Sequence, residues 1–260
     1  MKVTVITVAW NAAATIGDTM RSVAAQSHTD LEHIVIDGAS TDDTLSIVRA
    51  LAKGHTRVIS EPDNGLYDAM NKGIAAASGD GIGFLNADDF FCRTDAVALI
   101  AAGLASTDAV SASIAIVAAG DTAKLKRAYP SRPFAPWMLR FAHMPPHPGF
   151  YATRAAFAKV GCFDPSIRIS ADFEWMVRFF LVNRLIATPI PETIVSLRDG
   201  GLSSRGIASN QAINAEAVAS LRRHGIPTSQ PIVWSKYAIK ATQMGLKAYQ
   251  WPAPPAVHWP

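Results

Sequence analysis

Three short clusters of acidic, amide and hydroxyl side chains are the parts of this sequence best suited to bind a ligand or move a proton. The first is Asn86-Ala87-Asp88-Asp89, which follows the apolar stretch GIGFL. Carboxylate and amide oxygens suit Mg²⁺ or Mn²⁺, and such a cation completes its shell with phosphate oxygens and water. The run therefore predicts a divalent metal site for a phosphorylated ligand. The structural alternative is that Asp88 or Asp89 caps the segment that follows.

The second cluster spans residues 37–44, with the sequence DGASTDDT. Asp37 ends a short apolar run, and a glycine and two hydroxyl residues follow before a helical pattern begins. In such a connection Asp37 can accept hydrogen bonds from a nucleotide base or ribose, with backbone N–H groups close by. The same residues are also typical of a capping turn, in which Ser40 and Asp42 bond the first turn of the helix. The cluster alone leaves both interpretations open.

The third cluster begins with EPDNG at residues 61–65 and continues into a predicted helix. Asp68 and Asn71 stand three residues apart, so a helix presents both on one face. Met70 and Ile74 mark the buried side of that helix and place the two polar residues near its boundary. This favours a role in binding over a purely solvated helix face.

Strands and helices alternate through the first 90 residues, which predicts a parallel sheet flanked by helices. Ligands bind beyond the carboxyl ends of the strands in such sheets. We therefore expect residues 10–11, 37–40, 61–64 and 86–89 to gather on one rim. The expected strands here are 3–8, 33–36, 57–60 and 82–85, and the expected helices are 14–26, 41–53 and 66–77.

The alternation weakens after residue 90. A Pro-rich loop is expected at 130–148, and two helices are expected to end the chain. The expected strands are 109–118, 124–129, 150–153, 186–188 and 194–197, and the expected helices are 95–105, 154–160, 171–183, 208–224 and 234–250.

Charge is unevenly distributed. Residues 1–130 hold 10 Lys and Arg against 15 Asp and Glu, whereas residues 131–260 hold 14 against 6, which suggests that the two parts do different work.

No Lys/Arg run with interleaved aromatic residues is present, which argues against nucleic-acid binding. No apolar run approaches the roughly 20 residues of a membrane span. The N-terminal segment predicts a strand and not a signal peptide, and the two cysteines, expected to be reduced core thiols, favour the cytoplasm.

Taken as an ordered set, these segments resemble the family 2 glycosyltransferases. The opening TVAWNAAATIGDTMRSVAAQSHTDLEHIVIDGASTDDT is similar to the family's N-terminal pattern. The run EPDNGLYDAMNKGIAAASGDGIGFLNADD resembles the colanic-acid and exopolysaccharide branch. The likeness is dense over residues 2–91 and continues more thinly in HPGFY at 147–151, ADFEWMVR at 171–178 and GGLS at 200–203.

The resemblance implies an α/β protein with the GT-A fold, a Rossmann-like mixed sheet flanked by helices, and a helical C-terminal extension. The catalytic domain would span 1–205, with 1–91 binding the nucleotide sugar and 92–205 forming the acceptor side, and the extension would span 206–260. The implied reaction is inverting, non-processive sugar transfer from a nucleotide-sugar donor to an acceptor hydroxyl. A lipid-linked saccharide of cell-surface or exopolysaccharide synthesis is the expected acceptor.

The resemblance also assigns residues to roles. Asp172 would be the general base, Asp88 the acid that binds Mn²⁺ or Mg²⁺, and Asp37 the contact to the nucleotide base. The rest of the nucleotide-sugar site would be Thr7, Trp10, Asn11, Asp68, Asn71, Asn86 and Ala87. Assigned to the acceptor or pyrophosphate side are Asp89, His147, Arg178, Gly201 and Ser203.

Three departures from the family pattern bear on these roles. Asn86 stands where an Asp is more general, Ala171 replaces the Glu before the base, and Pro148 replaces a Gln after His147. The first two keep open a non-catalytic nucleotide-binding protein of the same fold. A sugar-nucleotide pyrophosphorylase would need a Gly-rich basic loop after the first strand, and Asn11-Ala12-Ala13-Ala14 is not such a loop.

The last expected helix, from Trp234 to Gln250, carries a stripe of lysines at 236, 240 and 247 opposite an apolar face. A basic stripe flanked by aromatic residues fits peripheral contact with an anionic membrane, here at its inner face. The alternative is a helix docked on the core by its Ala and Trp face. The two are compatible if the acceptor is lipid-linked.

Overall fold

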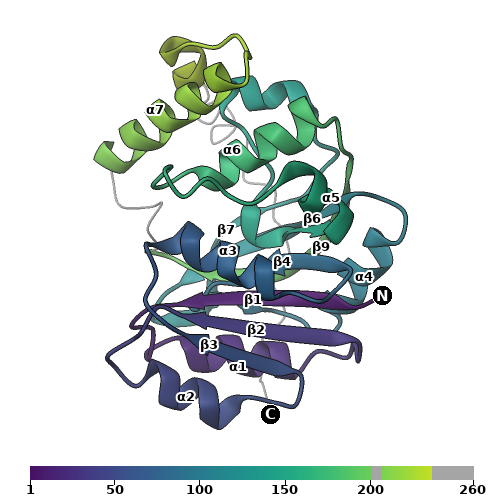
Figure 1. Cartoon of the computed structure of the whole chain (residues 1–260), viewed down its shortest axis with the longest axis vertical. Helices are drawn as coiled ribbons and strands as arrows, with labels where there is room; N and C mark the ends of the chain where they lie inside the picture. Colours follow the sequence, from purple (N-terminus) through teal and green to yellow (C-terminus); the bar gives the residue numbers. More distant parts are fainter. Residues whose placement is uncertain (201–206, 236–260) are drawn as a thin grey trace.

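The computed structural model describes residues 1–200 and 207–235, and it contains one mixed β-sheet with helices on both faces (Figure 1). The strands run in the order β3-β2-β1-β4-β8-β6-β9-β5, and β7 pairs with β6. Their bounds are β1 Val3–Ala9, β2 Leu31–Asp37, β3 Thr56–Ser60, β4 Gly81–Phe84, β5 Phe90–Phe91, β6 Ala109–Ala118, β7 Asp121–Tyr129, β8 Phe150–Thr153 and β9 Ala187–Arg198. The helices are α1 Ile16–Ala24, α2 Thr44–Leu51, α3 Leu66–Ala76, α4 Ala96–Leu104, α5 Arg154–Val160, α6 Ala171–Val177 and α7 Ile207–Arg223.

The first four strands form the parallel half that the sequence predicts. β1 lies between β2 and β4, and β2 pairs with β3, all in parallel. The register sets Ala9 beside Asp37 and Asp37 beside Ser60, so the three strands end at the same edge. The loops that follow them therefore start side by side, as predicted.

The second half makes the sheet mixed. β8 runs antiparallel to both β4 and β6, whereas β6 and β9 are parallel. The two short strands expected at 186–188 and 194–197 are one strand, β9, whose pairing shifts register near Ser113. The two-residue strand β5 was not expected. A strand this short shows no periodicity in the sequence, and it is defined only by its pairing with β9.

Two other expectations change. The helix expected at 171–183 is the α-helix α6 followed by a π-helical segment, η3, at Arg178–Val182. The Pro-rich loop contains two short 3₁₀ turns, η1 at Pro136–Phe141 and η2 at His147–Gly149. Both begin with a proline at the first or second position, which suits the fixed φ of that residue.

Alternation along β1 divides the core between the two faces of the sheet. Ile6 and Val8 pack with α3, α5, α6 and α7, whereas Val3 and Val5 pack with α4 and part of α1. α1 and α2 cover the outer strands on this second face through a smaller cluster that includes Met20 and Val48. The helices of the two sets lie on opposite sides of the sheet in Figure 1.

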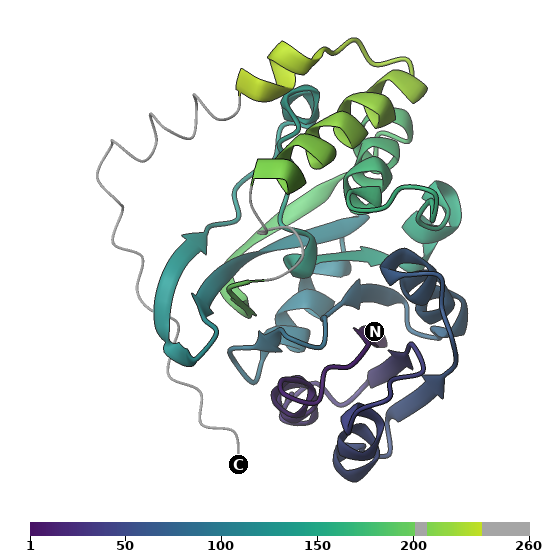
Figure 2. The same cartoon turned by 90° about the vertical axis from the view of Figure 1, so that its left-hand side faces the viewer.

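The described residues after 206, in the segment expected to form a C-terminal extension, pack on the rest of the chain. α7 lies along α6 at one end of the molecule, and Ala217 and Leu221 are buried in the main cluster (Figures 1 and 2). The lysine-striped helix expected at 234–250 lies outside the described residues beyond Ser235. No helix in the described ranges is long and apolar enough to cross a membrane.

Cys92 is a buried free thiol as expected, but Cys162 is exposed and not a core residue.

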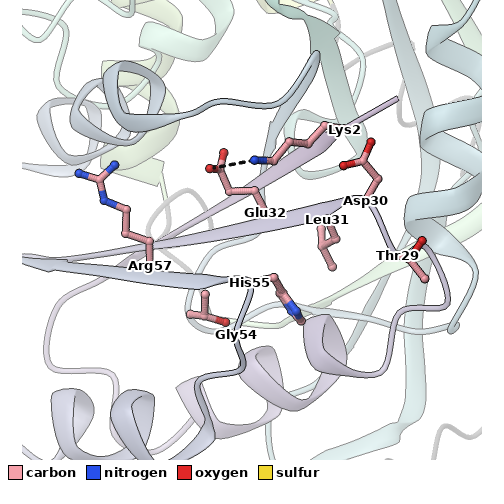
Figure 3. A pocket seen from close by; sticks show the side chains of 9 residues that line it. Lys2, Thr29, Asp30, Leu31, Glu32, Gly54, His55 and Arg57 are labelled. Atoms are coloured by element: carbon pink, nitrogen blue, oxygen red, sulfur yellow. Dashed lines mark ion pairs between the residues drawn. The ribbon is translucent and has the colours of Figure 1, made fainter.

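A hollow of about 410 Å³ lies at the amino ends of β1–β3, opposite the edge where these strands end. Its lining includes an ion pair of 3.5 Å between Lys2 and Glu32 (Figure 3). The Glu32 carboxylate also accepts hydrogen bonds from Thr4 Oγ1 at 2.6 Å, from Ser78 N at 2.7 Å and from Ser78 Oγ at 2.5 Å. Burial alone would raise the pKa of Glu32, but these hydrogen bonds outweigh it and lower the pKa to about 2.

Glu32→Gln should therefore destabilise the protein at neutral pH but not in acid. A carboxyl whose folded pKa is depressed contributes stability above its unfolded pKa and loses that stability as pH falls toward the folded value. We expect a loss of about 1–2 kcal/mol at pH 7, allowing for solvent screening of a partly exposed group. The difference from the parent should shrink between pH 5 and pH 2 in urea-unfolding experiments. An equal difference across this range would contradict the assignment.

Candidate active site

The loops after β1 and β2 are cross-linked at the carboxyl edge of the sheet. Asn11 N donates to Ser40 Oγ at 2.9 Å, and Thr41 N donates to Asn11 Oδ1 at 2.9 Å. Asn11 and Ala39 have φ of 47° and 56°, the left-handed region that non-glycine residues rarely occupy. Such conformations persist where the surrounding structure enforces them, often at ligand sites.

Asp37 lies at the base of these loops and is fully buried. Its Oδ2 accepts hydrogen bonds from Ser60 Oγ at 2.7 Å and Ser40 N at 3.2 Å. Its Oδ1 is buried and has no hydrogen-bond partner among the described residues. An unpaired buried acceptor is costly unless a ligand supplies a donor.

Trp10 and Asp63 flank the neighbouring Gly38. A Cβ at Gly38 would collide with Asp63 Oδ2 and lie 3.5 Å from the Trp10 indole. Trp10 is 71% exposed although its ring is large and apolar. An exposed aromatic face beside a free buried acceptor is suited to a planar, N–H-bearing ring.

The loop after β4 contains Asn86-Ala87-Asp88-Asp89 and begins where Leu85 N donates to Ile6 O. Asn86 Oδ1 is buried without a hydrogen-bond partner in the described ranges. The half-buried Asp88 carboxylate forms no hydrogen bond or ion pair with the described residues. Three hard oxygens at this turn, one from the amide and two from the carboxylate, therefore have no partner among the described residues. Ala87 is buried against α1 and α2 in the small cluster.

Asp89 lies beneath the loop and is 3% exposed. Burial and the adjacent Asp88 charge raise the pKa of Asp89 well above its usual range. Such a buried carboxyl is suited to a structural role, and it is bonded to the Asn86 side chain. Its expected place on the acceptor side stays a prediction that this burial does not favour.

Arg198, at the end of β9, holds the same loop and was missed in the sequence. It donates to the Asp88 carbonyl at 2.7 Å, pairs with Asp18 of α1 and stacks over Phe90 at 5.0 Å. It thus joins β9, α1 and the Asp88 turn. No local sequence pattern predicts this role, because its partners Asp88 and Asp18 lie 110 and 180 residues away in the sequence.

Asp172 is the second residue of α6 and reaches back to α3. The single Tyr67 hydroxyl hydrogen is shared between two acceptors, Ile169 O at 2.7 Å and Asp172 Oδ1 at 3.1 Å. Burial, and then the negative charge of Asp172, raise the pKa of Tyr67, so the phenol stays a hydrogen-bond donor. Asp172 remains partly exposed, with a carboxylate oxygen oriented by a buried phenol.

His147 packs at the end of β4, close enough to Asp172 to be affected by its charge. Its ring stacks on Phe84 at 5.4 Å and meets Phe163 edge-on at 5.8 Å. Burial lowers the pKa of His147, and the nearby Asp172 charge offsets only part of this effect. Phe84 stands two residues before Asn86, so His147 packs against the strand that leads into the candidate metal loop.

Arg178 is hydrogen-bonded within the protein, and its expected place on the acceptor or pyrophosphate side stays a prediction. Its guanidinium donates to Glu174 Oε1 at 2.9 Å and Oε2 at 2.8 Å, and to the carbonyls of Val160 and Cys162. Glu174 is itself buried and also contacts His224, the residue after α7, at 2.7 Å. These contacts make Arg178 a brace between α6 and the loop after α5.

Three further candidates also have partners within the protein. Asn71 pairs both amide atoms with the backbone of Phe163, each at 2.9 Å. Asp68 accepts from Asn64 N at 2.9 Å, and the buried Thr7 Oγ1 bonds His33 Nε2 at 3.0 Å. Their direct contact with a donor stays a prediction. Gly201 and Ser203 lie outside the described residues.

Comparison with known proteins identifies the family. The model of glycosyl transferase family 2 matches residues 4–185. An uncharacterized glycosyltransferase of Mycobacterium tuberculosis is 36% identical over 182 residues, covering 69% of each chain. A PGL/p-HBAD biosynthesis glycosyltransferase of Mycobacterium bovis is 29% identical over 205 residues, covering 75% of this chain and 76% of its own.

Solved structures agree on the architecture. Residues 1–349 of TarS from S. aureus superpose with a TM-score of 0.66 at 16% identity, covering 97% of this chain and 76% of that one. Glucosyl-3-phosphoglycerate synthase from Mycobacterium tuberculosis, solved with Mn²⁺, UDP and glucosyl-3-phosphoglycerate, gives 0.61 at 23% identity, covering 88% and 81%.

The mixed sheet flanked by helices is the GT-A fold. This chain belongs to glycosyltransferase family 2 and is a glycosyltransferase. That membership favours a transferase over both a pyrophosphorylase and a non-catalytic nucleotide-binding protein. The colanic-acid and exopolysaccharide branch stays a prediction.

Proposed function

We propose that this glycosyltransferase transfers a single sugar, with inversion, from a nucleoside diphosphate sugar to the hydroxyl of a saccharide acceptor. The observation that carries the proposal is the partly exposed Asp172, which is oriented by Tyr67 and whose charge acts on His147, the residue stacked on Phe84 at the end of β4. A carboxylate within reach of an acceptor hydroxyl, opposite a diphosphate site, is the arrangement that one-step displacement requires.

The donor would lie across the carboxyl edge of β1, β2 and β4. Asp37 Oδ1 is a buried acceptor without a partner in the described ranges, and Trp10 offers an aromatic face beside it. A nucleobase supplies both the N–H group and the π-face that these side chains lack. The sugar and diphosphate would then extend toward the loop at residues 86–89.

A divalent cation fits the free oxygens of that loop. Asn86 Oδ1 and the Asp88 carboxylate are hard ligands, and no cluster of three His, Cys, Asp or Glu residues that could hold a metal is present in the described part of the chain. Such a pair suits Mn²⁺ or Mg²⁺ that takes its other ligands from phosphates and water. When bound, the cation would neutralise charge on the diphosphate. The synthase from Mycobacterium tuberculosis was solved with both Mn²⁺ and UDP.

The transfer step then follows from the positions of the protein groups. The acceptor oxygen bonds to the anomeric carbon as its proton passes to Asp172. The bond between that carbon and the phosphate oxygen breaks, and the nucleoside diphosphate leaves with the electron pair. Tyr67 holds Asp172 in place through the hydrogen bond to Oδ1.

The acceptor is proposed to be lipid-linked, in cell-surface or exopolysaccharide synthesis. Support comes from the Mycobacterium bovis relative, whose name places it in PGL/p-HBAD biosynthesis. Peripheral contact with the inner face of the membrane through residues 234–250 stays a prediction, as does the cytoplasmic location. Trp234, at the start of that segment, is 43% exposed. The division of the chain at 91 and 205 is likewise proposed.

A thermal-shift panel tests the donor class. UDP-glucose, UDP-N-acetylglucosamine and GDP-mannose should be compared with Mn²⁺ or Mg²⁺ present. A ligand at about 100 times its Kd stabilises the folded state by about 2.7 kcal/mol, which corresponds to a rise in Tm of roughly 5–10 °C. We expect one nucleotide class to give this rise. The same Tm with every member of the panel would contradict a nucleotide-sugar site.

A further inference from the structure

The helix α7 reaches the loop that precedes the candidate base, although it lies beyond residue 185, where the family match ends. Glu216, in the middle of α7, accepts hydrogen bonds from Ser170 N at 2.9 Å and Ser170 Oγ at 2.6 Å. It also accepts from Ile169 N at 3.1 Å and from Arg168 N at 3.3 Å. The Glu216 carboxylate thus accepts hydrogen bonds from three consecutive backbone N–H groups and from one hydroxyl.

The loop at 168–170 is held from the opposite side as well. Tyr67 Oη donates to Ile169 O at 2.7 Å, so both polar groups of the Ile169 backbone are bonded to distant elements. Ser170 is the N-cap of α6, and Asp172 follows two residues later. The position of the Asp172 carboxylate is therefore set by where Glu216 and Tyr67 hold this loop.

The Glu216 interaction depends on an ionised carboxylate. Four donors converge on two oxygens, and only an acceptor-only group satisfies all of them. A glutamine has the same shape but turns one N–H₂ group toward these donors. Hydrogen bonds from N–H groups to a carboxylate are also about twice as strong as neutral ones.

A second contact aligns α7 with α6 beyond the loop. His224 Nε2 lies 2.7 Å from Glu174 Oε1, and Ala217 and Leu221 pack in the core between the two contacts. Glu216 of α7 and His224, the residue just after the helix, therefore contact the base-bearing segment on both sides of Asp172 in sequence. Figure 2 shows α7 lying alongside this part of the molecule.

We propose that Glu216 is a positioning residue for the general base, so that the C-terminal helix completes the active site. The proposal rests on the role of Asp172 proposed above. Glu216 does not contact the donor loops after β1, β2 and β4 in the described structure. Its loss should therefore affect the transfer step and leave donor affinity unchanged.

Glu216→Gln tests this directly in the full chain. Donor turnover is measured as release of UDP or GDP from the sugar nucleotide that stabilises the protein most, with water as acceptor. We expect kcat to fall about 10- to 30-fold, because a small displacement of a catalytic group has large effects, while donor KM changes less than twofold. The matched control is Gln211→Ala on the same helix, an exposed residue, which should retain the parent kcat.

Combination with Asp172→Asn separates positioning from general destabilisation. If Glu216 acts through the base, Glu216→Gln should lower kcat no further once Asp172 is Asn. Additive losses in the double variant, or a parent-like kcat in Glu216→Gln, would overturn the proposal. Should Glu216→Gln fail to fold, Ser170→Ala removes a single hydrogen bond and should lower kcat about 2- to 5-fold with the same non-additivity. An active Asp172→Asn enzyme would instead contradict the proposed base.

Discussion

Asp172→Asn should lower kcat about 10³-fold while leaving donor binding intact. A positioned general base contributes roughly 10²- to 10⁴-fold to a rate, and asparagine keeps the size and the hydrogen bond from Tyr67 but cannot take the acceptor proton. The loss should therefore appear in kcat and not in donor KM. Donor turnover at a series of donor concentrations is the measurement, because it separates the change in kcat from any change in donor KM.

The matched control is Asp30→Asn at the opposite end of the sheet. Asp30 lies beside the hollow at the amino ends of the strands and pairs with the N-terminal amine at 3.7 Å. This substitution makes the same chemical change far from the rim and should leave kcat within twofold of the parent. A Asp172→Asn variant with parent-like kcat would show that another group removes the acceptor proton.

Asp88→Ala should abolish the metal-dependent part of nucleotide binding and lower kcat/KM about 10²- to 10³-fold. Its carboxylate is the one charged group at the loop after β4 that is free of hydrogen bonds and ion pairs with the described residues, whereas Asp89 is buried and its pKa is raised. A cation that neutralises diphosphate charge contributes several kcal/mol to such a reaction. Calorimetric titration of UDP and GDP with and without Mn²⁺ measures the effect.

Asp121→Ala is the control for this prediction. Asp121 starts β7 at an exposed turn and bonds only the nearby Ala123 N within the described residues. It should retain the full difference between titrations with and without Mn²⁺. The account of the loop would be wrong if Asp88→Ala showed the same metal dependence as the parent.

The parallel half of the sheet was predictable because both its elements and its edge follow from local rules. Buried strands such as Val3–Ala9 and helices such as Leu66–Ala76 have the lengths and periodicities that short windows reveal. Once four parallel strands are predicted, their carboxyl ends must share an edge, which brings Asp37 near the loop that holds Asp88. The structure confirms this arrangement through the register of β1 with β2 and β4.

The residues that hold the site together could not be predicted in the same way. Tyr67 contacts Asp172 across 105 residues, and Arg198 contacts Asp88 across 110. These pairs depend on how β9, α3 and α6 are arranged in three dimensions, and neither follows from a periodicity or a turn motif. The sheet's second half was predicted less well for the same reason, since β5 exists only through its pairing with β9.

The uneven charge distribution has a clearer meaning in the folded chain. The acidic first half provides the rim with Asp37 and Asp88, where an anionic donor would need a cation. The basic second half contributes arginines that hold these segments. Arg198 donates to the Asp88 carbonyl in the rim, and Arg178 donates to the Cys162 carbonyl in the loop after α5. The two halves therefore build opposite sides of one proposed site on a continuous sheet.

The central claim is that the nucleotide binds at the carboxyl edge of β1, β2 and β4. A crystal structure with Mn²⁺ and UDP or GDP, using the anomalous signal of manganese, tests it most directly. We predict a manganese peak about 2.2 Å from the Asp88 carboxylate, with the base against Trp10 and within hydrogen-bond distance of Asp37 Oδ1. The account would be contradicted by a nucleotide bound elsewhere, for example in the hollow lined by Lys2 and Arg57, together with no manganese peak at Asp88.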